Sequence, residues 1–398
     1  MLNTPFSPWP SFTEEEANCA RDVILSNKVN YWTGQECRKF EQEFAEWIGT
    51  KYAVAVANGT VALDLALKAL GIGNGDEVVV TSRTFLASVS SIVNAGAVPV
   101  FADVNRDSQN IDASTIQRVL TPHTKAIVCV HLAGWPCDMD PIMALAAEKG
   151  LCVIEDCAQA HGATYKGKAV GSIGDVGAWS FCQDKIMTTG GEGGMVTTND
   201  RELWSRMWSF KDHGKSWESV YERQHQPGFR WLHESFGTNW RMLEVQGAIG
   251  RLQLQRMPQW HQARLHNAQR IWACANTLAG LRAPQLPDDI EHAAYKCYVF
   301  VEPDALRDGW DRDRILNEIV ARGVPCFSGS CSEVYLEKAF DGTAWRPEPR
   351  LQVARELGET SLMFLVHPTL TDAEIQKTCE VLTSVMGEAV TAAELKTR

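Results

Sequence analysis

The chain has 398 residues, of which 45% are hydrophobic and 22% are charged, so we expect a globular protein with more than one core. Its formal net charge of −11 argues against binding nucleic acid through a broad basic face, although a local pocket can still attract an anion. We expect no signal peptide, and no apolar run reaches the ~18 residues of a membrane helix.

Short apolar runs recur between residues 52 and 199. They occupy residues 52–58, 76–82, 98–104, 125–132, 151–157, 176–182 and 193–199. Helical patterns such as GTVALDLALKALG and PIMALAAEKG separate the first five runs. Continuous runs that alternate with helices are typical of strands buried on both faces. The sequence therefore predicts an α/β fold with a large, mostly parallel, seven-stranded sheet covered by helices.

The pattern changes after residue 200. Residues 201–214 are predicted to be helical, and residues 215–238 form an aromatic and polar loop of a length that is usually functional or held by a partner. A long helix is predicted over 240–280, with a break near Pro258. A strand over 293–303 and helices over 311–323 and 371–388 follow. We predict a large domain with an N-terminal arm (residues 1–260) and a small α+β domain (residues 261–398).

Polar and small residues gather at the carboxyl ends of the predicted strands. They are Asn58-Gly59-Thr60, Thr81 to Phe85, His131, Asp156 to His161, and Ser180 to Lys185. A packed core does not require such residues at these positions, whereas the functional residues of open α/β sheets collect there. The strand ends therefore predict the position of a functional site.

The segment 153–200 combines groups that pyridoxal 5′-phosphate (PLP) requires. Asp156 ends a strand, Lys185 follows 29 positions later, and a glycine-rich loop spans Gly190 to Gly194. A lysine amine can hold the cofactor aldehyde as a Schiff base, and a buried carboxylate can keep the pyridine nitrogen protonated. Each residue alone has an ordinary explanation, as a solvated lysine, a turn aspartate or a hairpin glycine. The hypothesis of a PLP site depends on these residues occurring together, in this order, at the ends of predicted strands.

With these motifs, the chain resembles the DegT/DnrJ/EryC1/StrS sugar aminotransferases, which are fold type I PLP enzymes. The similarity covers nearly the whole length and is most specific from EDxAQAxG through SFxxxK to GEGGMVxTND. It implies that Lys185 is the catalytic Schiff-base lysine. It also implies that Asp156 pairs with the pyridine nitrogen and that Gln159 binds the ring hydroxyl.

The resemblance implies further contacts to the cofactor. These are the phosphate binders Gly59, Thr60 and Ser180, the ring-stacking Phe85, and Asn239, which reaches the phosphate in the neighbouring subunit of a homodimer with shared active sites. Two positions depart from the family pattern: Asn58 stands where Ser is frequent, and Cys182 stands where His is frequent. The departure at Cys182 leaves the substrate contacts near the lysine open, as do the stretches 215–238 and 323–340.

The activity that the resemblance implies is transfer of an amino group from glutamate to the keto group of a nucleotide-linked sugar, in amino-sugar biosynthesis for a surface polysaccharide or glycoconjugate. Pyridoxamine 5′-phosphate would form between the two half-reactions. A branch of the family with His at the lysine position acts as a sugar dehydratase, and Lys185 favours transamination instead. A non-catalytic PLP-binding regulator is a remote alternative, because such domains are usually fused to a DNA-binding segment.

Cysteine and histidine positions give no metal-binding pattern. The twelve cysteines include no CxxC, and several lie in apolar runs, which indicates buried, reduced thiols in a reducing cytoplasm. His131, His161 and His213 lie near predicted strand or helix ends without the spacing of motifs such as HExxH. We predict no metal and a cytoplasmic location.

Overall fold

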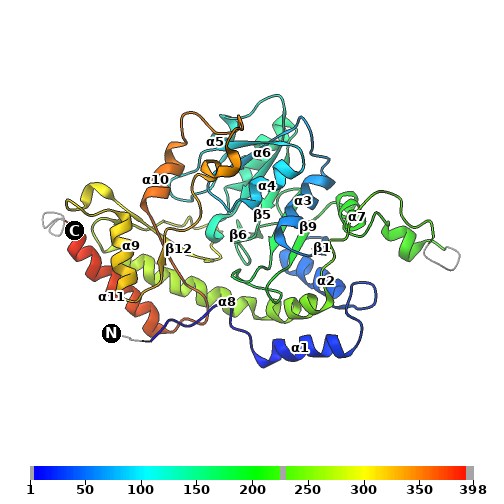
Figure 1. Ribbon diagram of the computed structural model, residues 1–398, viewed down its shortest axis with the longest axis horizontal. Helices are drawn as coiled ribbons and strands as arrows, with labels where there is room; N and C mark the ends of the chain where they lie inside the picture. Colours follow the sequence, from blue (N-terminus) through cyan, green and yellow to red (C-terminus); the bar gives the residue numbers. More distant parts are fainter. Residues whose placement is uncertain (1–3, 225–229, 391–398) are drawn as a thin grey trace.

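The computed structural model describes residues 4–224 and 230–390, and a seven-stranded sheet forms its centre (Figure 1). In spatial order the strands are β1 (Tyr52–Val56), β9 (Gly194–Thr198), β8 (Val176–Ser180), β5 (Cys152–Asp156), β4 (Thr124–Val130), β2 (Glu77–Thr81) and β3 (Val98–Ala102). Strand β9 is antiparallel to β1 and β8, whereas the other neighbouring pairs are parallel. The predicted seven-stranded, mostly parallel sheet is confirmed.

The strands are apolar throughout because each face of the sheet is covered by helices. In β2, Val78 and Val80 belong to the core on one face, and Val79 belongs to the core on the other. The core on the face of Val78 includes residues of α2 (Glu36–Ile48), α3 (Gly59–Ala69) and α4 (Ala87–Asn94), and the core on the face of Val79 includes residues of α5 (Ala113–Gln117) and α6 (Met139–Lys149). Helix α7 (Arg201–Phe210) packs beside α3 and β1.

Helix α8 (Glu244–Asn276) runs without interruption through Pro258, so the predicted break is wrong. Proline lacks the N–H that would bond to the carbonyl four residues earlier, which costs one hydrogen bond. Helices α1 (Glu14–Leu25), α2 and α11 (Asp372–Ala389) pack along α8 and hold it in one piece (Figure 1). Tertiary packing therefore overrides the local effect of the proline.

A second core lies beyond the C-terminal half of α8. It is built on an antiparallel sheet with the strand order β10 (Leu281–Arg282), β12 (Cys297–Val301), β14 (Ser361–Phe364) and β13 (Cys326–Phe327). Helices α9 (Arg312–Ala321) and α11 cover it, and α10 (Gln352–Thr360) packs into the core on the α5–α6 face of the large sheet. Met257 belongs to the core of the large sheet and Ala268 to the second core, so a boundary at residue 260 would cut through α8. The division at 260 stays a prediction.

Short elements connect the two parts. Strand β11 (Ile290–Glu291) pairs with β6 (Thr164–Tyr165), which pairs in turn with β7 (Lys168–Ala169). Near the N-terminus, Ser7 bonds to Glu374 in α11, and the indole Nε1 of Trp9 donates to the carbonyl oxygen of Lys185 at 2.9 Å. The N-terminal segment therefore spans from the second core to the loop that carries Lys185.

The loop predicted over 215–238 contains a π-helical turn at Glu218–Glu222, and its residues 225–229 lie outside the described part. All twelve cysteines are free, but only six of them are buried and Cys331 is exposed, so the expectation of general burial is wrong. In the ranges 4–224 and 230–390, no helix combines the length and the apolar composition needed to cross a membrane.

Two helical glycines should respond in opposite ways to substitution by alanine. A Cβ on Gly247 of α8 would lie 2.7 Å from the backbone nitrogen of Cys37 in α2, whereas a Cβ on Gly387 of α11 would meet nothing within 4 Å. We expect Gly247→Ala to lower the free energy of unfolding by about 1–3 kcal/mol and Gly387→Ala to raise it by about 0.5–1 kcal/mol. Urea denaturation of both variants measures this, and equal effects would contradict the close approach of α2 to α8.

Candidate active site

A cavity of about 830 Å³ opens at the carboxyl ends of the central strands. Seven of the eight residues predicted to form the site line it: Gly59, Thr60, Phe85, Asp156, Gln159, Ser180 and Lys185. The rest of the lining comes from the antiparallel sheet and the residues just before it, and includes Tyr295 and Lys296 before β12 and Met363 in β14. The remaining predicted residue, Asn239, is exposed and is not part of this lining.

The start of α3 and the end of β8 form a small cradle. The Asn58 side chain caps α3 by accepting a hydrogen bond from the Val61 amide at 3.0 Å, so the cap does not use the amides of Gly59 or Thr60. A Cβ on Gly59 would lie only 2.5 Å from the Cβ of Ser180 and 2.8 Å from its hydroxyl oxygen. Glycine therefore allows helix amides and a serine hydroxyl to face one point, as a phosphate group requires.

Asp156 is a buried carboxylate at the end of β5. Its Oδ2 accepts from the Ser88 hydroxyl at 2.7 Å and its Oδ1 from the Ala158 amide at 3.2 Å. Burial raises the pKa of Asp156, and hydrogen bonds from Ser88 and Ala158 and the charge of Lys185 oppose this rise only in part. A protonated ring nitrogen beside Asp156 would offset the cost of its burial. Ser88 was missed in the sequence because nothing in the α4 pattern distinguishes it from its neighbouring serines.

Lys185 lies between the two cores. Its Nζ is 5.2 Å from the centroid of the Tyr295 ring, and the Tyr295 hydroxyl donates to Asp184. The charge of Lys185 and the hydrogen bond from Tyr295 lower the pKa of Asp184 more than burial raises it. Tyr295 and Lys296 were also missed, because they lie just before β12, more than 100 positions away from Lys185, where the spacing gives no link to the PLP motifs.

Two further predicted residues complete the cavity. Phe85 is 70% exposed although it is aromatic, and it presents a free ring to the cavity lining. The Oε1 of Gln159 accepts from the Ala133 amide at 2.8 Å, which leaves its Nε2 as a hydrogen-bond donor. Cys182 also lines the cavity, and its thiol lies 3.8 Å from the Glu192 carboxylate. The phosphate cradle, the buried acid, the free aromatic ring and the lysine together fit PLP.

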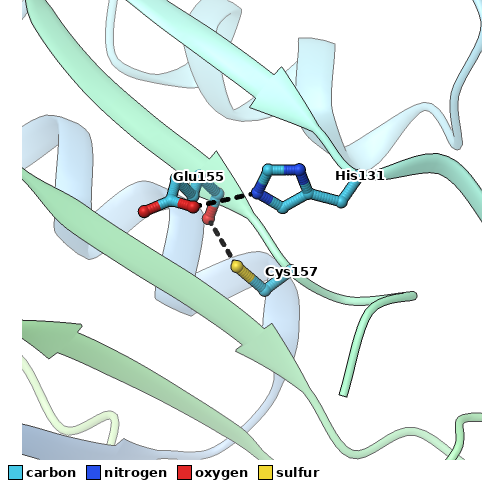
Figure 2. Close-up of side chains that lie close together, drawn as sticks. All are labelled: His131, Glu155 and Cys157. Atoms are coloured by element: carbon cyan, nitrogen blue, oxygen red, sulfur yellow. Dashed lines mark hydrogen bonds and ion pairs between the residues drawn. The ribbon is translucent and has the colours of Figure 1, made fainter. Parts of the chain in front are cut away.

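His131, Glu155 and Cys157 are buried side chains that lie close together, with their candidate ligand atoms within 4.8 Å of one another (Figure 2). The Nδ1 of His131 accepts from the Cys137 amide, so Nε2 carries the proton and donates to Glu155 at 3.0 Å. Glu155 accepts further bonds from the amides of Gly171, Ile173 and Gly174. Both ring nitrogens of His131 already form hydrogen bonds in this network. The predicted lack of a metal stays a prediction.

The sequence profile of the DegT/DnrJ/EryC1/StrS aminotransferase family matches residues 10–383. The chain belongs to this family. A solved aminotransferase from Psychrobacter cryohalolentis is 64% identical and superposes with a TM-score of 0.95 over 96% of this chain and 99% of that one. GDP-perosamine synthases from Escherichia coli O157:H7 and Caulobacter vibrioides are 45% and 36% identical over 62% and 92% of this chain, and over 64% and 95% of their own lengths.

These similarities confirm the predicted family, the fold type I architecture, the aminotransferase activity and the use of PLP. The matched segment spans less than two thirds of the E. coli relative, whereas it spans nearly all of the Caulobacter relative.

The network around Glu155 predicts a stability effect. Glu155→Gln would place an amide N–H₂ group against backbone N–H donors, so we expect the free energy of unfolding to fall by about 2–4 kcal/mol. The exposed control Glu148→Gln should change it by less than about 0.5 kcal/mol. Urea denaturation at pH 7 measures both.

The pH dependence of this effect has a definite sign. Burial raises the pKa of Glu155, but its bonds to His131 and the backbone amides outweigh burial and hold the pKa below its ordinary value of 4.5. The stabilisation is therefore present above 4.5 and is lost as the pH falls through the lowered folded-state pKa. The difference between wild type and Glu155→Gln should shrink in acid, and a difference that grows there would contradict the network.

Proposed function

We propose that the chain transfers an amino group from glutamate to the keto group of a nucleotide-linked sugar, in the biosynthesis of an amino sugar for a surface polysaccharide or glycoconjugate. The observation that carries this proposal is the placement of Lys185 and Asp156 in one cavity with the Gly59–Ser180 cradle. The two relatives named as GDP-perosamine synthases support the class of acceptor.

Each residue of the cavity has a defined task in this proposal. PLP, when bound, supplies an electron sink for the electrons released from the substrate carbon. The Lys185 amine would hold the cofactor through its aldehyde group, and, when free, it would move the proton between substrate and cofactor. Asp156 keeps the proton on the ring nitrogen, since its burial favours a cationic neighbour.

The other lining residues orient the cofactor. The amides of Gly59 and Thr60 and the Ser180 hydroxyl bind the phosphate, because a helix start and a hydroxyl together suit a dianion. The Nε2 of Gln159 would donate to the ring hydroxyl, and the exposed ring of Phe85 would supply an aromatic contact to the cofactor.

Dehydration of a sugar is the alternative reaction on this fold. Lys185 argues against it, because the dehydratase branch has His at that position. The two reactions differ in their products: transamination consumes glutamate and releases 2-oxoglutarate, whereas dehydration releases none. Regulation without turnover would bind the cofactor and release no product at all.

Asn239 supports a homodimer with shared active sites. It lies outside the cavity of its own chain, and it is held at the surface by β-bridge pairing with Asp212. Arg241 contacts the same Asp212 at 2.6 Å, which fixes the segment on both sides of Trp240. A rigid, exposed asparagine is suited to reach a phosphate in a neighbouring subunit.

The first test removes the lysine. Lys185→Ala should lose both the visible absorption of a lysine-bound cofactor and the release of 2-oxoglutarate from glutamate and keto-sugar nucleotides, because no amine remains to bind the aldehyde. Lys338→Ala, at an exposed lysine that does not line the cavity, should retain both. A screen with GDP-, dTDP- and UDP-linked keto sugars would name the acceptor. A wild-type protein that takes up no PLP would contradict the proposal.

The second test mixes two inactive subunits. Asn239→Asp would place a carboxylate against the phosphate, so this variant and Lys185→Ala should each be inactive alone. In a dimer of one subunit of each kind, sharing across the interface leaves one site intact. Random mixing should therefore recover about one quarter of the wild-type activity. No recovery, with mixed dimers shown by mass spectrometry, would place Asn239 in its own subunit's site.

A further inference from the structure

Three cations converge on one carboxylate at the wall of the cavity formed by the second core. Lys296 follows Tyr295 and directly precedes β12, and its Nζ lies 4.8 Å from the centroid of the Tyr295 ring. Lys185 approaches the same ring, with its Nζ at 5.2 Å. The fully buried Arg264 of α8 lies behind them and interacts with Asp184 and Lys296. Asp184 is the carboxylate that faces all three cations, and Tyr295 already donates to it.

This arrangement leaves a surplus of positive charge. Lys296 forms no ion pair within 4.0 Å in residues 4–224 and 230–390, and two guanidinium nitrogens of Arg264 lack a hydrogen-bond partner there. Burial lowers the pKa of Lys296 to about 8, and the attraction of Asp184 offsets this only in part because Arg264 and Lys185 repel the ammonium. Lys296 is half-buried, and an ammonium that is partly removed from water without a carboxylate at ion-pair distance is costly, so this wall is suited to receive an anion.

We propose that Lys296 binds the α-carboxylate of the amino-acid donor, an inference that rests on the proposed aminotransferase function. Lys296 lines the cavity, whereas Arg264 does not, so Lys296 is the cation that a substrate can contact. In an amino acid, the carboxylate oxygens lie about 3 Å from the amine nitrogen. A cation that recognises this carboxylate must therefore lie beside the lysine that the amine displaces. Lys296 meets this condition, because its Nζ and the Nζ of Lys185 both lie near the Tyr295 ring.

The diphosphate of the sugar nucleotide fits this position less well. It is attached to the anomeric carbon, and part of the sugar ring separates it from the keto carbon that must reach Lys185. The cofactor phosphate has its own cradle at Gly59 and Ser180, which is formed by the large sheet rather than by the second core. The donor carboxylate is therefore the anion that matches the distance from Lys185.

The two half-reactions separate the donor from the acceptor. The first, from PLP to pyridoxamine phosphate with glutamate, can be followed in a single turnover by the change in visible absorption. The second can be followed in reverse with the aminated sugar nucleotide. Lys296→Met keeps the length of the side chain and removes its charge. We expect it to raise the half-saturating glutamate concentration about tenfold to hundredfold, because a charge-assisted hydrogen bond is lost.

The same variant should leave half-saturation by the aminated sugar nucleotide within about twofold of wild type. Lys296→Arg should recover most of the glutamate affinity, and the exposed control Lys168→Met should change neither half-reaction. An unchanged visible spectrum of Lys296→Met shows that the cofactor site is intact. Unchanged glutamate affinity, or an equal loss for the sugar nucleotide, would overturn the assignment. A wild type that does not react with glutamate at all would instead overturn the proposed function.

Discussion

The start of α3 reaches the end of β8 at a distance that no side chain on residue 59 would permit. A Cβ there would overlap Ser180, and a Cβ on Gly194 of β9 would overlap the carbonyl of Asn58. Two glycines on different elements thus allow three backbone segments to meet at one edge of the sheet. The phosphate cradle, the position of Lys185 after β8 and the entry of the glycine-rich loop into β9 all depend on this meeting point.

Two neighbouring acids of β5 differ in role: one carboxylate is part of a structural hydrogen-bond network, and the other faces the cavity. Glu155 and Asp156 are both buried acids, and side chains alternate along a strand, so they face opposite sides. Glu155 meets four donors, and its pKa is lowered. Asp156 meets two donors and the cavity, and its pKa is raised. The first carboxylate is satisfied by the protein, whereas the second keeps capacity for a cationic ligand.

Much of this arrangement could be predicted from the sequence, because parallel strands bring their carboxyl ends to one edge regardless of their order. That rule explains why Gly59, Phe85, Asp156 and Ser180 were found together without knowledge of the topology. Ser88 could not be predicted, because its role depends on the rotation of α4 against β5. The same holds for Tyr295 and Lys296, which enter through the packing of a second core.

The course of α8 could not be predicted for a related reason. A proline is a local feature, and its cost of one hydrogen bond is small compared with the contacts that α1, α2 and α11 make along the helix. Asn239 marks the opposite limit: its exposed position is visible in one chain, but the role that we propose for it requires a second chain. Sequence patterns are thus most informative where function follows from the sheet, and least where it follows from packing between units.

The bond from the Trp9 indole to the Lys185 carbonyl joins residues 176 positions apart in the chain. Ser7, two residues earlier, is hydrogen-bonded to Glu374 of α11. The short segment from Ser7 to Trp9 therefore links the Lys185 loop to α11. N-terminal segments of this kind are usually regarded as suitable positions for a fusion partner or for truncation. In this enzyme, the geometry of the lysine loop is set partly from there, and a cut after residue 9 would be an active-site mutation in effect.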